Sequence, residues 1–217
     1  MKKIFVLLFI CTDIFNVFGQ ENKHNTLLES IYHKDQLARE KLIEFEQKEI
    51  IDSIAFYYTL MDTNDKENRK IVFKILDNEG WPQGLSEKAN DAIFLVIQHA
   101  PHKFQLKYSE VVKKSAENGK IKQKDFATLY DRILMQDGKK QIYGTQMVAK
   151  MRDGNRVSYI WPVENSENID KLRLSIELLP FDLYIKVVKK STGIIVVWDK
   201  NLTIEKLQSL PDPIIVK

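Results

Sequence analysis

The side chains of this chain that could do chemistry occur in three short stretches between residues 98 and 146. A histidine, His99, follows an apolar run and Gln98, and an acid beside an arginine, Asp131 and Arg132, comes further along. An imidazole can transfer protons near neutral pH, a carboxylate can orient it, and a guanidinium can hold an anion. If the stretches meet in space, His99 is a candidate general acid or base, with Asp131 as its orienting group and Arg132 as an anion anchor.

Hydrogen-bonding and aromatic side chains that could hold a substrate lie in the same region. We expect residues 141 to 150 to form a strand, which places Gln141, Tyr143 and Thr145 in a row on one face. An anionic or amide-bearing compound would suit such a row. The residues predicted to bind it are Trp81, Gln98, Gln141, Tyr143, Thr145 and Gln146.

Each of these residues also has a purely structural interpretation. His99 would end an apolar helix, where the negative helix end favours its charged form, and it would equally suit a core or capping role. Asp131 and Arg132 could form a structural ion pair or anchor a helix end. Trp81 could fill the core, with its indole N–H on a loop carbonyl.

The sequence lacks the motifs of the common catalytic and cofactor sites. It contains no GxxxxGK phosphate loop, no dinucleotide glycine fingerprint, no GxSxG nucleophile turn and no HExxH zinc motif. The four histidines include one close pair, His99 and His102, and Pro101 separates its members. We therefore expect neither a metal nor a cofactor.

The first nineteen residues have the pattern of a cleavable signal peptide. Two lysines precede an apolar run from residue 4 to residue 12, which is too short to span a bilayer because that takes about 20 residues. Val17 and Gly19 are small residues of the kind a signal peptidase accepts before its cut. We expect export to the periplasm or the medium, and a mature chain that begins at Gln20 and has no membrane span.

Charge divides unevenly between the two halves of the expected mature chain. Residues 20–100 hold 10 Lys and Arg against 15 Asp and Glu, and residues 101–217 hold 21 against 14, which gives −5 and +7. A basic half favours an anionic partner, although an acidic helix packed near basic helices explains the same numbers. Because export argues against nucleic acid, the partner we expect is a small anionic or amide-bearing compound of the cell envelope.

Helical periodicity dominates the remainder and predicts a mainly α fold of the α+β kind. We expect about six helices, one β-hairpin around residues 153–155, and room for a short C-terminal strand. A turn is predicted at residues 62–65, and residues 181–198 fit either a helix opened by proline or a hairpin. The predicted parts are a helical segment over 20–60, a core domain over 61–190 and an extension over 191–217.

Several short motifs follow one another along the chain. They are GWP at residues 80–82, QHA at 98–100, LxDR at 129–132 and QxYGTQ at 141–146. In this order they resemble a bacterial domain family of unknown function, over roughly residues 61–184 and including Arg173, with a weaker DQxxR match from Asp35. The resemblance implies a shared fold and a shared polar cluster, and it brings no known reaction. Family members often have an aspartate after QHA, where this chain has Pro101.

Two kinds of function remain open. In the first, the protein is a binding or interaction module whose polar residues form a buried hydrogen-bond network that fixes the hairpin onto the helices. In the second, it is a hydrolase-like or lyase-like enzyme of the cell envelope, in which His99 is the general acid or base of an open cleft. The lack of an identifiable nucleophile, metal or cofactor favours the first.

Overall fold

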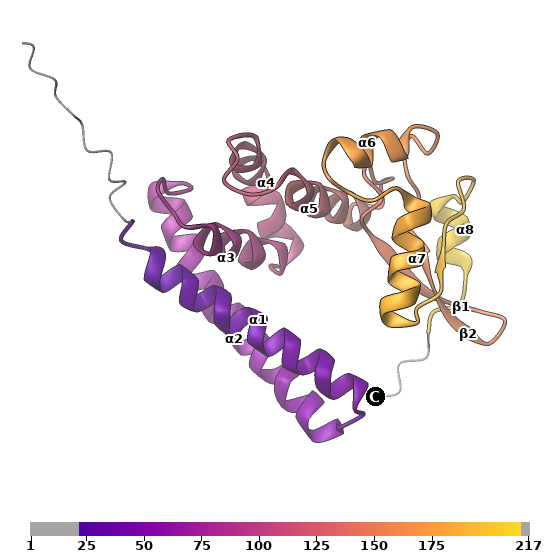
Figure 1. The fold of residues 1–217 in the computed structure, drawn as a ribbon, viewed down its shortest axis with the longest axis horizontal. Helices are drawn as coiled ribbons and strands as arrows, with labels where there is room; N and C mark the ends of the chain where they lie inside the picture. Colours follow the sequence, from indigo (N-terminus) through magenta and orange to yellow (C-terminus); the bar gives the residue numbers. More distant parts are fainter. Residues whose placement is uncertain (1–21, 214–217) are drawn as a thin grey trace, which may run out of the picture.

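Two long helices form a hairpin at one side of the molecule in the computed structural model, which describes residues 22–213 (Figure 1). The predicted signal peptide therefore lies outside the described residues. α1 (Asn25–Gln47) and α2 (Ile51–Glu79) lie side by side, and their connected ends project away from the other helices. The helices contact each other along much of their length.

The predicted turn at residues 62–65 is wrong, because α2 continues through it. This run contains neither glycine nor proline, and its acids find partners that a helix can provide. Asp62 accepts a hydrogen bond from Lys66 one turn later, and Asp65 accepts one from Arg39 of α1. The polar run is thus a helix face and not a break.

Three further helices complete the larger hydrophobic core. α3 (Glu87–Gln98) contacts α1, α2 and α4 (His102–Glu117), while α5 (Gln123–Gln136) packs against α4. α3 begins at the cap residue Ser86, whose hydroxyl accepts a hydrogen bond from the Ala89 N–H, and its side chains Ile93 and Ile97 are fully buried. This packing places the C-terminal end of α3 beside α5.

A small sheet follows the helices. β1 (Met147–Arg152) and β2 (Asn155–Ile160) are antiparallel, with Met147 opposite Ile160. Their turn places Asp153 and Gly154 at φ +50° and +76°, which is the left-handed pair that a two-residue hairpin requires. The predicted hairpin is confirmed, although β1 begins six residues later than the strand expected from residue 141.

The C-terminal part covers the sheet with short helices. α6 (Ile169–Ser175) precedes α7 (Phe181–Thr192), which begins after Pro180 and ends at Gly193, where φ is +72°. β3 (Val196–Val197) then joins β2 in parallel, and α8 (Ile204–Ser209) follows. Of the two alternatives predicted for residues 181–198, the helix is the one observed, and it extends to residue 192. The mainly α fold with a small β part is confirmed, with eight helices and three strands among the described residues.

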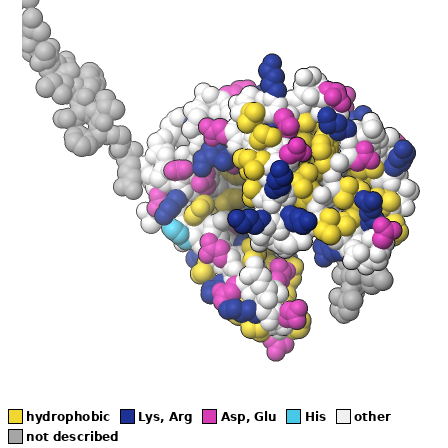
Figure 2. Space-filling model, turned by 45° about the vertical axis from the view of Figure 1, so that its right-hand side comes forward, with side chains coloured by type: hydrophobic (Ala, Val, Ile, Leu, Met, Phe, Trp, Pro, Cys, Tyr) yellow, Lys and Arg dark blue, Asp and Glu magenta, His cyan; other side chains and the backbone are white. Residues whose placement is uncertain are grey.

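The surface carries mixed charge and scattered apolar groups. On the face seen in Figure 2, Lys and Arg side chains are interspersed with Asp, Glu and apolar side chains and do not form one continuous basic patch. In residues 22–213, none of the helices combines the length and the apolar character needed to span a bilayer.

Candidate functional site

A single buried carboxylate, that of Asp131 on α5, organises the loop that follows the helix. Its oxygens accept hydrogen bonds from the backbone N–H groups of Ile142 (2.8 Å), Tyr143 (3.0 Å) and Thr145 (3.0 Å), and from the Thr145 hydroxyl (3.0 Å). Burial raises the pKa of Asp131, and these four donors oppose that rise. Asp131 is therefore an anchor for the chain that follows its own helix.

Residues 141–146, which we call the Asp131 loop, do not form the predicted strand. The side chain of Gln141 joins the two ends of the loop. Its Nε2 donates to the carbonyls of Gln146 (3.0 Å) and Trp161 (2.6 Å), and its Oε1 accepts from the Gln146 N–H (2.8 Å). Successive N–H groups turn inward to Asp131, which an extended strand does not allow. The expected row of side chains on one strand face is thus wrong.

Gly144 is the tightest point of the Asp131 loop. Its φ is +68°, and a Cβ added there would overlap the aromatic ring of Phe181 from α7. Only glycine combines this left-handed backbone with such close packing. The loop is therefore pressed between α5 and α7.

Arg173 of α6 supports the same loop through its backbone carbonyls. It is almost completely buried, and it donates to the carbonyls of Tyr143 (2.8 Å), Gly144 (2.9 Å) and Leu179 (2.6 Å). Its guanidinium also lies over the Phe181 ring, 4.3 Å from the centroid. The sequence pointed to Arg173 only as part of the family resemblance, because the residues around a helical arginine do not show that its side chain will be buried.

Arg132 brings the three predicted stretches together. From α5 its Nη1 donates to the carbonyl of Gln98 at the end of α3 (3.0 Å), and its Nε donates to Oε1 of Gln146 in the Asp131 loop (3.3 Å). Gln146 in turn donates to the Thr128 carbonyl of α5 and to the Thr145 hydroxyl. The helix end, the acid-arginine pair and the glutamine-rich loop therefore share one location.

His99 lies in this location beside charges from the α1–α2 hairpin. The pKa of His99 is lowered to about 4, first by burial and then by the positive charges of Arg39 and Arg132, while Asp35 acts in the opposite direction. The expectation that the helix end favours charged His99 is wrong, because burial and two guanidinium groups outweigh a partial helix charge. The imidazole is neutral at pH 7.

Arg39 of α1 belongs to the same group, and the sequence pointed to it only through the DQxxR match. Its Nη2 donates to Asp35 (2.9 Å) and to Asp65 of α2 (3.0 Å). Arg39 thus has two carboxylate partners. We call the set formed by Arg39, His99 and Arg132 the Arg132 cluster.

Arg132 differs from Arg39 in its counter-charges. It is half-buried, its two hydrogen-bond acceptors are both uncharged, and within residues 22–213 it forms no ion pair. Burial and the charge of Arg39 lower the pKa of Arg132. Its Nη2 has no hydrogen-bond partner in the described part of the chain. The cluster therefore has an unneutralised positive charge at a partly enclosed position.

Several residues that the sequence predicted to bind a ligand are buried elsewhere or are already hydrogen-bonded within the protein. Trp81 is buried in the helical core, and its indole N–H donates to Oδ1 of Asn90 (2.7 Å) instead of to a loop carbonyl. The hydroxyl of Thr145 is used by Asp131, and no hydrogen bond joins Asp131 to His99 among the described residues. The Oε1 atom of Gln98 is buried without a partner in the same range. The side chain of Tyr143 is half-buried, and its hydroxyl has no hydrogen-bond partner among residues 22–213.

The fold and the site define a mainly helical protein in which one buried carboxylate shapes a loop beside a half-buried arginine. The chain belongs to a family of unknown function (DUF6624), whose model matches residues 24–197. The expectation of a family without a known reaction is thereby confirmed. No match to this chain was found among curated proteins or among solved structures.

Proposed function

We propose that this protein is an exported binding module that holds a small anion, such as a carboxylate or a phosphate, at the Arg132 cluster. The observation that carries the proposal is the contrast between its two arginines. Arg39 has two carboxylate partners, whereas Arg132 is half-buried and, in residues 22–213, has none.

A partly buried charge without a counter-charge is costly, because it loses hydration and gains no ion pair in return. An anion at Arg132 would remove that cost and could accept from its Nη2 atom. Guanidinium groups bind carboxylates and phosphates with directional hydrogen bonds. The neutral ring of His99 can donate a further hydrogen bond, and the charge of Arg39 adds a favourable field.

The remaining polar residues support binding more than catalysis. The side chains of Asp131 and Gln141 bond to the loop backbone, and the Gln146 side chain accepts from Arg132, so these residues act as a scaffold that holds Arg132 in place. Asp131 is fully engaged by the loop, which leaves His99 without the orienting carboxylate that the enzyme hypothesis assigned to it. A general-base role for His99 remains a second candidate, since its lowered pKa leaves the ring able to accept a proton.

Anion-dependent stabilisation tests the proposal. The melting temperature of residues 20–217 is measured with phosphate, sulfate or acetate against chloride at constant ionic strength, for the wild type, Arg132→Gln and the exposed control Arg156→Gln. At ten times the Kd, binding adds about 1.4 kcal/mol and raises the melting temperature by about 3–5 °C. We expect this rise in the wild type and the control only. An equal rise in all three proteins, or none in the wild type, refutes the proposal.

The enzyme candidate has its own test. His99→Gln and the wild type are compared on pooled envelope substrates comprising peptides, esters, glycosides and phosphates. Turnover by the wild type that the variant lacks, at unchanged stability, would favour catalysis. A less stable variant with no activity in either protein would end that candidate.

A further inference from the structure

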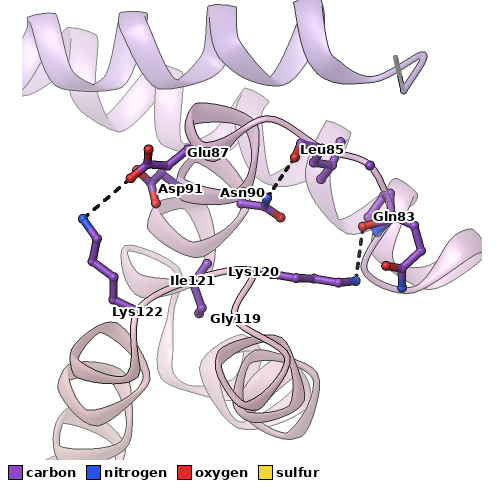
Figure 3. Close-up of a pocket in the computed structure, with 11 residues that line it drawn as sticks. Gln83, Leu85, Glu87, Asn90, Asp91, Gly119, Lys120, Ile121 and Lys122 are labelled. Atoms are coloured by element: carbon purple, nitrogen blue, oxygen red, sulfur yellow. Dashed lines mark hydrogen bonds and ion pairs between the residues drawn. The ribbon is translucent and has the colours of Figure 1, made fainter. Parts of the chain in front are cut away.

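A pocket separate from the Arg132 cluster lies next to the GWP motif. It has a volume of about 500 Å³ and is formed by residues 82–85, the first turns of α3 and the turn between α4 and α5 at residues 119–122 (Figure 3). This volume is within the usual range for small-molecule sites, about 300–1,000 Å³. We call it the GWP pocket. It contains none of the residues predicted from the sequence to bind a ligand.

The two walls of the GWP pocket carry opposite charges. Figure 3 shows Glu87 and Asp91 on α3 across from Lys120 and Lys122 on the turn. Lys122 forms a long ion pair of 3.8 Å with Glu87 at an exposed position, so this pair contributes little to stability. The pocket is thus divided into an acidic side and a basic side.

The inner charged group of each wall, Asp91 or Lys120, forms no ion pair within residues 22–213. Asp91 forms neither an ion pair nor a side-chain hydrogen bond with any residue in the described range, 22–213. Burial, followed by the nearby charges of Asp125 and Glu87, raises the pKa of Asp91, and the charge of Lys122 opposes that rise only in part. Lys120 donates only to the carbonyls of Trp81 (3.1 Å) and Pro82 (3.3 Å), and burial lowers its pKa.

The polar groups at the base of the pocket are already used. Asn90 accepts from the Trp81 indole and donates to the carbonyls of Leu85 and Ser86. The Asn90 amide is therefore satisfied, while Asp91 and Lys120 are the groups able to take a ligand. A simple anion would be repelled by the acidic wall, and a simple cation by the basic wall.

We propose that the GWP pocket binds a zwitterion, a free amino acid or a short peptide with both termini uncapped. Asp91 accepts the ligand ammonium, and Lys120, aided by Lys122, binds the ligand carboxylate. Each inner charge gains its missing counter-charge in this arrangement. The proposal is independent of anion binding at the Arg132 cluster, because the two sites share no residue.

The test uses the dipeptide alanyl-alanine with residues 20–217, followed by amide chemical shifts in NMR. We expect saturable shifts in residues 84–91 and 119–122, and binding weakened at least about tenfold by Asp91→Asn. N-acetyl-alanyl-alanine and alanyl-alanine amide, which each lack one charge, should also bind at least about tenfold more weakly. Because Asp91 has no hydrogen-bond or ion-pair partner in the part of the chain that the structure describes, the variant should keep the wild-type fold.

Two further variants make the outcome decisive. Asp153→Asn, at an exposed acid of the hairpin turn, should bind like the wild type, and so should Arg132→Gln. No shift in the wild type at millimolar dipeptide, or equal binding by Asp91→Asn or by the capped dipeptides, would overturn the proposal. Loss of dipeptide binding in Arg132→Gln alone would place the ligand at the other site.

Discussion

Replacing Asp131 by Asn exchanges one carboxylate oxygen for an NH₂ group. We expect this change to destabilise the protein more than a similarly small change in any other polar side chain that bonds to the Asp131 loop. The carboxylate accepts from three backbone N–H groups and one hydroxyl, at 2.8–3.0 Å for the shortest contact of each. An amide can accept at one oxygen only, and its NH₂ would face the Thr145 N–H. The bond from the Thr145 N–H is lost with its donor left buried, the Thr145 hydroxyl has to turn and accept instead of donate, and the bonds from Ile142 and Tyr143 lose their charge assistance. We expect a loss of about 3–5 kcal/mol, since each hydrogen bond to a charged group contributes about 1.5–3 kcal/mol.

The measurement is the free energy of unfolding in urea at pH 7, followed by circular dichroism. Asp153→Asn is the matched control, because Asp153 has a 90% exposed side chain and Asn accepts its φ of +50° equally well. We expect a change within about 0.5 kcal/mol for the control. A loss below about 1 kcal/mol in Asp131→Asn would show that the carboxylate does not hold the loop.

Three other outcomes follow from the same contacts. Gly144→Ala should lose at least about 3 kcal/mol of unfolding free energy in urea, because both the positive φ and the Phe181 ring oppose a Cβ; wild-type stability would contradict the packing. The pKa of His99 is about 4 in the folded protein and about 6.5 in an unfolded chain. The unfolded state therefore takes up the proton first as the pH falls. The stability that neutral His99 contributes is complete above pH 6.5 and is lost as the pH falls toward 4. Wild type should therefore lose about 3 kcal/mol more than His99→Gln over that interval in urea unfolding, and parallel pH profiles would refute this. Protein recovered from outside the cytoplasm should begin at Gln20 by N-terminal sequencing, and an intact Met1 would contradict export.

Helices could be predicted where an apolar face and a clear boundary coincide. α3 follows a capping serine, has fully buried Ile93 and Ile97, and stops before Pro101, so its sequence determines its limits. The hairpin turn at Asp153 and Gly154 was equally plain, because few residues adopt left-handed backbone in succession. The turn expected at residues 62–65 failed because polarity alone does not end a helix.

The meeting of the three polar stretches was predictable, but Trp81 lies in the helical core and the construction of the Asp131 loop was not predictable. Alternation from Gln141 to Thr145 resembles a strand, and only a carboxylate supplied by α5 bends that segment into a loop. The charge of His99 also depends on Arg39, which comes from a helix far away in the sequence. Such tertiary effects leave no local pattern, and the GWP pocket, built from three separate segments, was missed for the same reason.

The most direct test of anion binding at the Arg132 cluster is the NMR signal of the Arg132 Nε–H group during a phosphate titration at constant ionic strength. We expect this signal to shift and saturate, together with the ring signals of His99, while the signal of exposed Arg156 stays unchanged. An Arg132 signal that does not move, or that moves only in parallel with the Arg156 signal, would contradict the proposal that Arg132 binds an anion.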